Sequence, residues 1–198
     1  MLKEQLTVTR IVLLLLSIAT LAGTLSWSLA TLAYEADAFQ AGQWWRPFSA
    51  WITQLNLRHW ILNQWGIVVM VILLPKRLSW WQWTGFVVMW LVTSMALAMS
   101  DYSNYVGLSG LLYGWLIWSA FLSPFYTRWI KLIFIGALSI KVFSENGWLP
   151  LPQSEWVGSF IQARVAHESH LWGLLSGFLV IAVTASVQRF RSTPARHD

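Results

Sequence analysis

Six long apolar runs, each separated from the next by a polar break, constrain the fold of this 198-residue chain more than any other feature. A helix needs about 20 mainly apolar residues to cross a bilayer. Charged residues make up 11% of the chain, whereas an ordinary soluble domain carries about 25%. These features predict an all-α polytopic membrane protein, with residues 1–198 forming one domain of six membrane-spanning helices. The runs cover residues 11–33, 57–74, 80–99, 107–123, 129–144 and 168–188.

The distribution of positive charge predicts the orientation of these spans. An even number of spans places both termini on one side, and if that side is the cytoplasm, nine of the 13 Lys and Arg residues lie inside, as the positive-inside rule requires. We therefore expect residues 1–10 and 191–198 to be cytoplasmic and the net charge of +5 to reflect orientation, with no nucleic-acid partner. The inside residues are Lys3, Arg10, Lys76, Arg77, Arg128, Lys131, Arg189, Arg191 and Arg196.

The first run has an alternative interpretation as a cleaved signal peptide. It is disfavoured because residues 11–33 exceed the about 7–15 apolar residues of a signal core. The 16 tryptophans suit the aromatic belts of a membrane protein. The absence of cysteine excludes disulfides, thiolate metal sites and a cysteine nucleophile.

Polar residues stand at the start of the second, fourth and sixth runs. His59 and Asn63, spaced i, i+4, share a helix face in the second run, Ser109 opens the fourth, and His170 opens the sixth. Alternate spans begin on the same side, so these residues are expected at one depth, just inside the outer leaflet. Polar groups within spans are costly and often functional, although a Ser commonly bonds its own helical turn and a His/Asn pair commonly joins two helices.

Small residues accompany two of these sites. Gly110 and Gly114 are i, i+4 in the fourth run, and Gly173 and Gly177 are i, i+4 in the sixth. Such faces let membrane helices approach closely. A Ser–His hydrogen bond between the two runs would need this approach because both side chains are short.

A serine becomes a nucleophile when a positioned base takes its proton, and His170 is the candidate base for Ser109. The backbone amide of Ser109, at a helix start, and the side chains of His59 and Asn63 are candidate oxyanion donors. Tyr113, one turn after Ser109, either packs the imidazole in place or fills space.

No buried carboxylate presents itself as a third member of the site. Asp101 lies in a loop, and Glu168 is too close to His170 in sequence to share its helix face. The sequence therefore predicts a Ser–His dyad. A zinc site is the rival, since the segment His167-Glu168-Ser169-His170 is one residue short of H-E-x-x-H and His59 could add a ligand, but with no carboxylate ligand evident we expect neither metal nor cofactor.

Together these residues resemble the rhomboid family of intramembrane serine proteases over essentially the whole chain. The resemblance implies that Ser109 and His170 are catalytic, that His59, Asn63 and the Ser109 amide bind the oxyanion, and that the fourth and sixth spans pack together. Gln54 and Ala50 occupy the region where many rhomboids carry another His. The matching blocks are Trp45-Arg46, His59-x-x-x-Asn63, Gly107-Leu108-Ser109-Gly110 with Tyr113, and His170-x-x-Gly173-x-x-x-Gly177.

Within that family, the compact chain and the segments 55–59 and 168–171 are similar to rhombosortases. This similarity implies a bacterial inner-membrane enzyme that opens to the periplasm and cleaves C-terminal sorting tails, each a Gly-Gly stretch, a hydrophobic helix and basic residues. The alternatives are a general rhomboid protease of other single-span proteins and a non-catalytic helix-binding protein. A transporter is disfavoured because inverted repeats and paired intramembrane charges are not evident.

Overall fold

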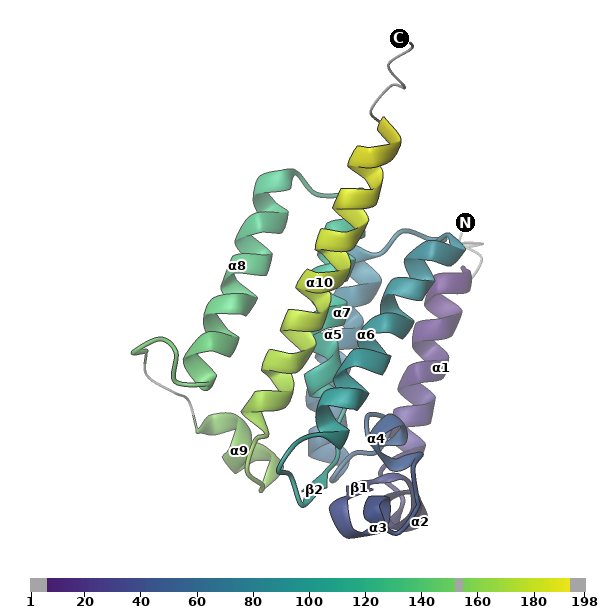
Figure 1. Cartoon of the computed structure of the whole chain (residues 1–198), viewed down its shortest axis with the longest axis vertical. Helices are drawn as coiled ribbons and strands as arrows, with labels where there is room; N and C mark the ends of the chain where they lie inside the picture. The colour runs from purple at the N-terminus through teal and green to yellow at the C-terminus, as the bar shows by residue number, and fades with distance from the viewer. Residues whose placement is uncertain (1–6, 152–154, 193–198) are drawn as a thin grey trace, which may run out of the picture.

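The computed structural model describes residues 7–151 and 155–192 and is mainly helical (Figure 1). Lys3 and Arg196 and most of the two predicted cytoplasmic ends lie outside the described residues. The elements are α1 (Val8–Ala22), α2 (Ser26–Leu32), β1 (Tyr34–Glu35), α3 (Ala36–Gln40), α4 (Arg46–Ser49), α5 (Leu57–Leu73), α6 (Trp80–Ala98), β2 (Asn104–Tyr105), α7 (Ser109–Leu122), α8 (Arg128–Glu145), α9 (Trp156–Ile161) and α10 (His167–Ser192).

Helix length and hydropathy identify fewer spans than the six expected. Among the described residues, α6 and the segment His167–Gln188 of α10 are long and apolar enough to cross a membrane, and the bent pair α1 and α2 would be a third. Helices α5 and α7 are apolar but shorter, and α8 is interrupted by four charged residues. The fold is that of a multi-pass helical membrane protein, and the count of six stays a prediction.

The first predicted span is not one helix. Its run breaks at Gly23, and α1 and α2 meet at an angle of 97°. The break is filled by the following loop, because the carbonyl of Ile52 lies against Gly23 and the amide of Gln54 donates to the Gly23 carbonyl at 3.0 Å. Helix α2 therefore belongs with the loop elements at the lower end of Figure 1.

Helix α7 is the centre of the bundle. It contacts α5, α6, α8 and α10, and its buried residues lie on all of its faces, as expected for a helix surrounded by others. With 14 residues it is about 21 Å long, shorter than the about 30 Å hydrocarbon core of a bilayer. A helix this short cannot reach both surfaces, so at least one of its ends lies within the membrane.

Helix α8 is the least enclosed of the long helices and stands to one side of the bundle (Figure 1). Its buried residues are Val142 and Ser144, both near its C-terminal end. Its N-terminal half exposes large apolar side chains, including Trp129 and Ile133. This pattern fits a helix with one face toward lipid, half-buried side chains such as Leu138 against the core, and its most enclosed part at the C-terminal end.

The predicted Trp-Arg pair holds the loop between α2 and α5. Arg46 is 4% exposed and donates to the carbonyls of Ala33 (2.6 Å) and Ala30 (2.8 Å). Its Nε also donates to the side chain of Gln43 at 2.7 Å. Trp45 adds a bond from its ring nitrogen to the Thr31 carbonyl at 3.0 Å. These donors satisfy backbone carbonyls around the end of α2 where the helix leaves them free.

We predict that Arg46→Ala lowers the free energy of unfolding by about 3 kcal/mol, because two carbonyls lose charged donors. The measurement is a denaturant titration of the detergent-solubilised protein. Arg58→Ala is the matched control, since Arg58 is exposed and makes a single 3.4 Å bond to the Phe160 carbonyl. Equal destabilisation by the two substitutions would contradict this account of the loop.

Candidate active site

Ser109 and His170 meet although they are 61 positions apart in the chain. Ser109 is the first residue of α7, and His170 lies in the first turn of α10. The Oγ of Ser109 is 3.1 Å from Nε2 of His170. His170 is 5% exposed, whereas Ser109 is only half-buried. The predicted contact is therefore present, with its hydroxyl still open to an approaching molecule.

Glycines bring the two helices to this distance. A Cβ on Gly173 would collide with the carbonyl of Gly110, and one on Gly114 would collide with the carbonyl of Gly173. A Cβ on Gly177 would lie 2.7 Å from Ile117. The small-residue faces expected from the sequence thus meet each other, and backbone lies against backbone without intervening side chains.

The expectation that no carboxylate joins the site is wrong, although the carboxylate is partly rather than fully buried, with its side chain 15% exposed. Glu145, the last residue of α8, places Oε2 2.9 Å from Nδ1 of His170. A carboxylate accepts hydrogen bonds and does not donate them, so Nδ1 carries the proton and Nε2 is left to accept from Ser109. The arrangement is a chain of three groups, Ser109–His170–Glu145, where a dyad was predicted.

The sequence did contain a signal for Glu145. Lys141 and Glu145 are i, i+4 and so lie on one face of an otherwise apolar run, and in the structure they form an ion pair. Lys141 also lies 5.4 Å from the centre of the Tyr113 ring. Tyr113 packs against His170 with ring centres 4.6 Å apart, which agrees with the first of its two interpretations. The imidazole is therefore held by Ser109, the carboxylate and an aromatic ring.

The opposite side of Ser109 faces α5. The backbone amide of Leu55 donates to Nδ1 of His59 at 3.4 Å, which leaves the proton on Nε2. The His59 ring packs on Gly107, whose φ of +125° and lack of a Cβ make room for it. The amide of Ser109, as the first residue of a helix, belongs to the N–H groups without a partner inside the helix. The described geometry therefore places potential hydrogen-bond donors beside the hydroxyl.

Asn63 is held by a residue that the sequence analysis did not assign to the site. Its Nδ2 donates to Oε1 of Gln54 at 2.6 Å, and both side chains are buried. The Nε2 of Gln54 is buried without a hydrogen-bond partner. Gln54 comes from the loop before α5, so only the packing of that loop against the helix brings the two amides together.

Two cavities meet at Ser109. One, of about 270 Å³, is lined by α5, α7, α8, α9 and the start of α10 and includes His59, Asn63, Glu145 and His170. The other, of about 140 Å³, lies toward residues 161–166 and 104–106 and includes His59 and Ser109. Trp45 and Arg46 line neither cavity, so within the described residues they support the loop rather than the site.

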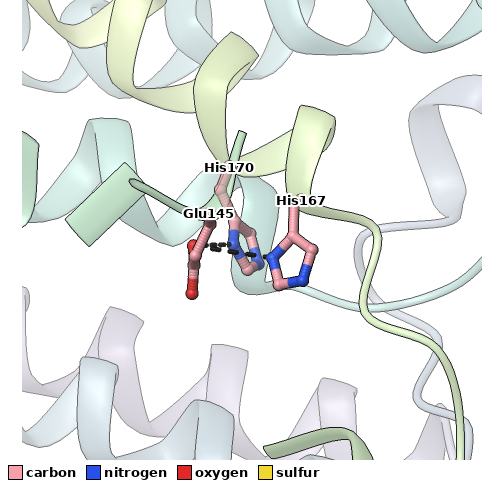
Figure 2. Close-up of side chains that lie close together, drawn as sticks. All are labelled: Glu145, His167 and His170. Atoms are coloured by element: carbon pink, nitrogen blue, oxygen red, sulfur yellow. Dashed lines mark hydrogen bonds and ion pairs between the residues drawn. The ribbon is translucent and has the colours of Figure 1, made fainter. Parts of the chain in front are cut away.

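The two histidines of the segment weighed earlier as a rival zinc site, His167 and His170, lie close together beside Glu145 (Figure 2). The rings of His167 and His170 lie beside the Glu145 carboxylate, with ligand atoms within 4.8 Å of one another. The cluster thus contains a carboxylate that the sequence analysis missed, and His59 is not one of its members. Glu145 and Nδ1 of His170 already share a 2.9 Å hydrogen bond, so a metal ion would have to displace that proton. That hydrogen bond accounts for Oε2 of Glu145 and Nδ1 of His170, whereas Nδ1 of His167 lies 3.7 Å from Oε2 and is buried without a hydrogen-bond partner.

We predict that Gly173→Ala lowers stability by about 1–3 kcal/mol, because overpacking forces α7 and α10 apart. Thermal unfolding in detergent measures the change. Gly136→Ala is the control, since Gly136 lies in α8 with nothing near its missing Cβ, and Ala is favoured there by about 1 kcal/mol. Retention of wild-type stability by Gly173→Ala would show that the helices are not in close contact.

Comparison with known proteins adds one match. A family model for the rhomboid domain matches residues 41–187, well over half of the chain and every residue of the site. No curated protein and no solved structure shows a significant match.

Proposed function

Because the chain belongs to the rhomboid family, whose members are generally intramembrane serine proteases, we propose that it is an intramembrane serine endopeptidase with Ser109 as nucleophile and His170 as general base. The observation that carries the proposal is the 3.1 Å contact between Ser109 Oγ and His170 Nε2. Reactive serines require such a base, and the half-buried hydroxyl opens onto two cavities.

The proposed reaction follows from the positions of these groups. His170 Nε2 takes the Ser109 proton as Oγ attacks the peptide carbonyl, and the resulting imidazolium then protonates the departing amine. The Ser109 amide, His59 and Asn63 are the proposed donors to the oxyanion. Water then attacks the acyl-serine, with His170 again taking a proton, and releases a carboxylic acid and the free hydroxyl.

For the membrane arrangement we infer that the chain crosses the membrane six times, with the start of α1 and the C-terminal end of α10 in the cytoplasm. The start of α1 and the end of α10 lie at one end of the molecule, opposite α2–α4 and α9 (Figure 1). The distribution of Lys and Arg supports this orientation. Ser109 then opens toward the outer face, which in a bacterial inner membrane is the periplasm.

For the substrate we propose single-span proteins with a C-terminal sorting tail, as in rhombosortases. A peptide bond inside a helix is shielded by helical hydrogen bonds, so the segment must unwind before it reaches Ser109. Two glycines weaken a helix by about 1 kcal/mol each relative to Ala. The larger cavity, lined by Leu62 of α5 and Leu138 of α8, provides an apolar site for the residues that follow.

A fluorophosphonate probe tests the nucleophile. We predict that it labels the detergent-solubilised wild type, while Ser109→Ala and His170→Ala abolish labelling, as read by in-gel fluorescence. Ser139→Ala is the matched control, because Ser139 bonds the carbonyl of its own turn at 2.8 Å and should not affect labelling. Labelling of Ser109→Ala at the wild-type rate would refute the assignment, and absence of both labelling and cleavage would favour a non-catalytic helix-binding protein.

A pair of matched substrates tests whether the enzyme prefers a sorting tail that contains Gly-Gly. We predict that a single-span substrate with Gly-Gly before its helix and basic residues after it is cleaved about 30-fold faster than the same substrate with Ala-Ala, since two substitutions change unwinding by about 2 kcal/mol. Quantitative gel analysis in bicelles measures both rates. Equal rates would favour a general protease of single-span proteins.

A further inference from the structure

We propose that Glu145 is a positioning residue for His170, so that the reaction uses a Ser109–His170–Glu145 chain whose acid is supplied by α8. The inference rests on the proposed protease function and deepens it. The carboxylate bonds Nδ1 at 2.9 Å while Ser109 occupies Nε2 at 3.1 Å. The two contacts lie on the two nitrogens of one ring, as in a serine protease with an acid third member.

The carboxylate has two effects on the imidazole. It accepts the Nδ1 proton, which keeps the lone pair on Nε2 directed at the Ser109 hydroxyl. It also faces the ring on which positive charge develops when the serine proton is taken, and it stabilises that charge without taking the proton itself. Glu145 acts through His170 and does not touch the peptide bond.

Lys141 and Tyr113 hold the Glu145 carboxylate and the His170 ring in position. Lys141 is one turn before Glu145 and pairs with its other oxygen, Oε1. Tyr113 packs on the imidazole and lies beneath the Lys141 ammonium. The carboxylate therefore has a partner on each oxygen, which compensates for its removal from water. His167 approaches the His170 side of the carboxylate at 3.7 Å, a longer contact.

The location of the acid on α8 couples helix packing to chemistry. Val142 and Ser144, the buried residues of α8, lie in the same last turn as Glu145, and the other residues of the helix are half-buried or exposed. Glu145 is also the end of α8, next to the cavity at Ser109. Displacement of this end of the helix would remove the acid from His170 while leaving Ser109 and His170 on α7 and α10.

The test is Glu145→Gln in the full chain, assayed in detergent with the Gly-Gly substrate. We expect kcat to fall by at least about 100-fold, less than the about 10⁴-fold loss seen for the equivalent acid in the soluble template, with KM within twofold. Fluorophosphonate labelling of Ser109 should slow in parallel. The hydrogen-bonded Nδ1 proton of His170, observed by NMR of protein with labelled histidine, should be present in the wild type and lost in the variant.

Two further variants distinguish an effect of Glu145 on the position of His170 from an effect of the substitution on folding. Glu168→Gln is the matched control, because Glu168 is an exposed carboxylate on the first turn of α10 and does not bond His170, so it should leave kcat unchanged. If the single variant fails to fold with Lys141 unpaired, Glu145→Gln with Lys141→Gln removes both charges, and the same loss of kcat is expected.

The outcomes distinguish this inference from the function on which it rests. A kcat for a folded Glu145 variant within threefold of wild type, with Ser109 still labelled, would overturn the role of Glu145 and leave the protease intact. A wild type that neither reacts at Ser109 nor cleaves any helical substrate would overturn both.

Discussion

The carbonyl oxygen of Gly110 lies against the Cα of Gly173, and this contact sets how closely α7 and α10 approach. Apolar side chains gain little by leaving lipid for the interior of a bundle, so membrane helices associate through close packing of small residues. In the proposed mechanism that packing also brings the reacting groups together, because the Ser109 and His170 side chains are short and begin on these two helices. The 3.1 Å bond between them exists only while no side chain separates the backbones.

Two charged side chains that are largely enclosed in this apolar bundle have partners within the protein. Arg46 ends on backbone carbonyls of the α2 region, and Glu145 ends on Lys141 and His170. An unpaired buried charge destabilises a protein strongly, whereas a paired one is close to neutral. The cluster around Arg46 holds the loop between α2 and α5. The cluster around Glu145, in the proposed mechanism, orients the base His170 (Figure 2).

The shortness of α7 links the fold to access for water and substrate. A 14-residue helix cannot span the hydrocarbon core, and its first residue is Ser109. Non-helical backbone at membrane depth requires protein or water around it, and here Gly107 and the loop at Gln54 provide the protein surroundings while the two cavities at Ser109 provide space. A peptide bond could be cut inside the membrane only at such a place.

The amino-acid sequence by itself determined the helical membrane class and the approximate position of each long helix, because apolar length and charge are local properties of the chain. It also predicted that Ser109 meets His170, because the order of the spans places both residues at one depth and glycine spacing allows the two helices to approach. It predicted the close faces of 110–114 and 173–177 for the same reason, whereas it left open whether Tyr113 packs on the imidazole or fills space. It did not determine that the first run would break at Gly23, since the break depends on Ile52 and Gln54 packing into it. Nor did it determine the Gln54–Asn63 bond or the third group of the site. Glu145 lies at the end of α8, and it faces His170 only because of the way that α8 packs on the bundle. This packing depends on contacts between helices that are distant in the chain.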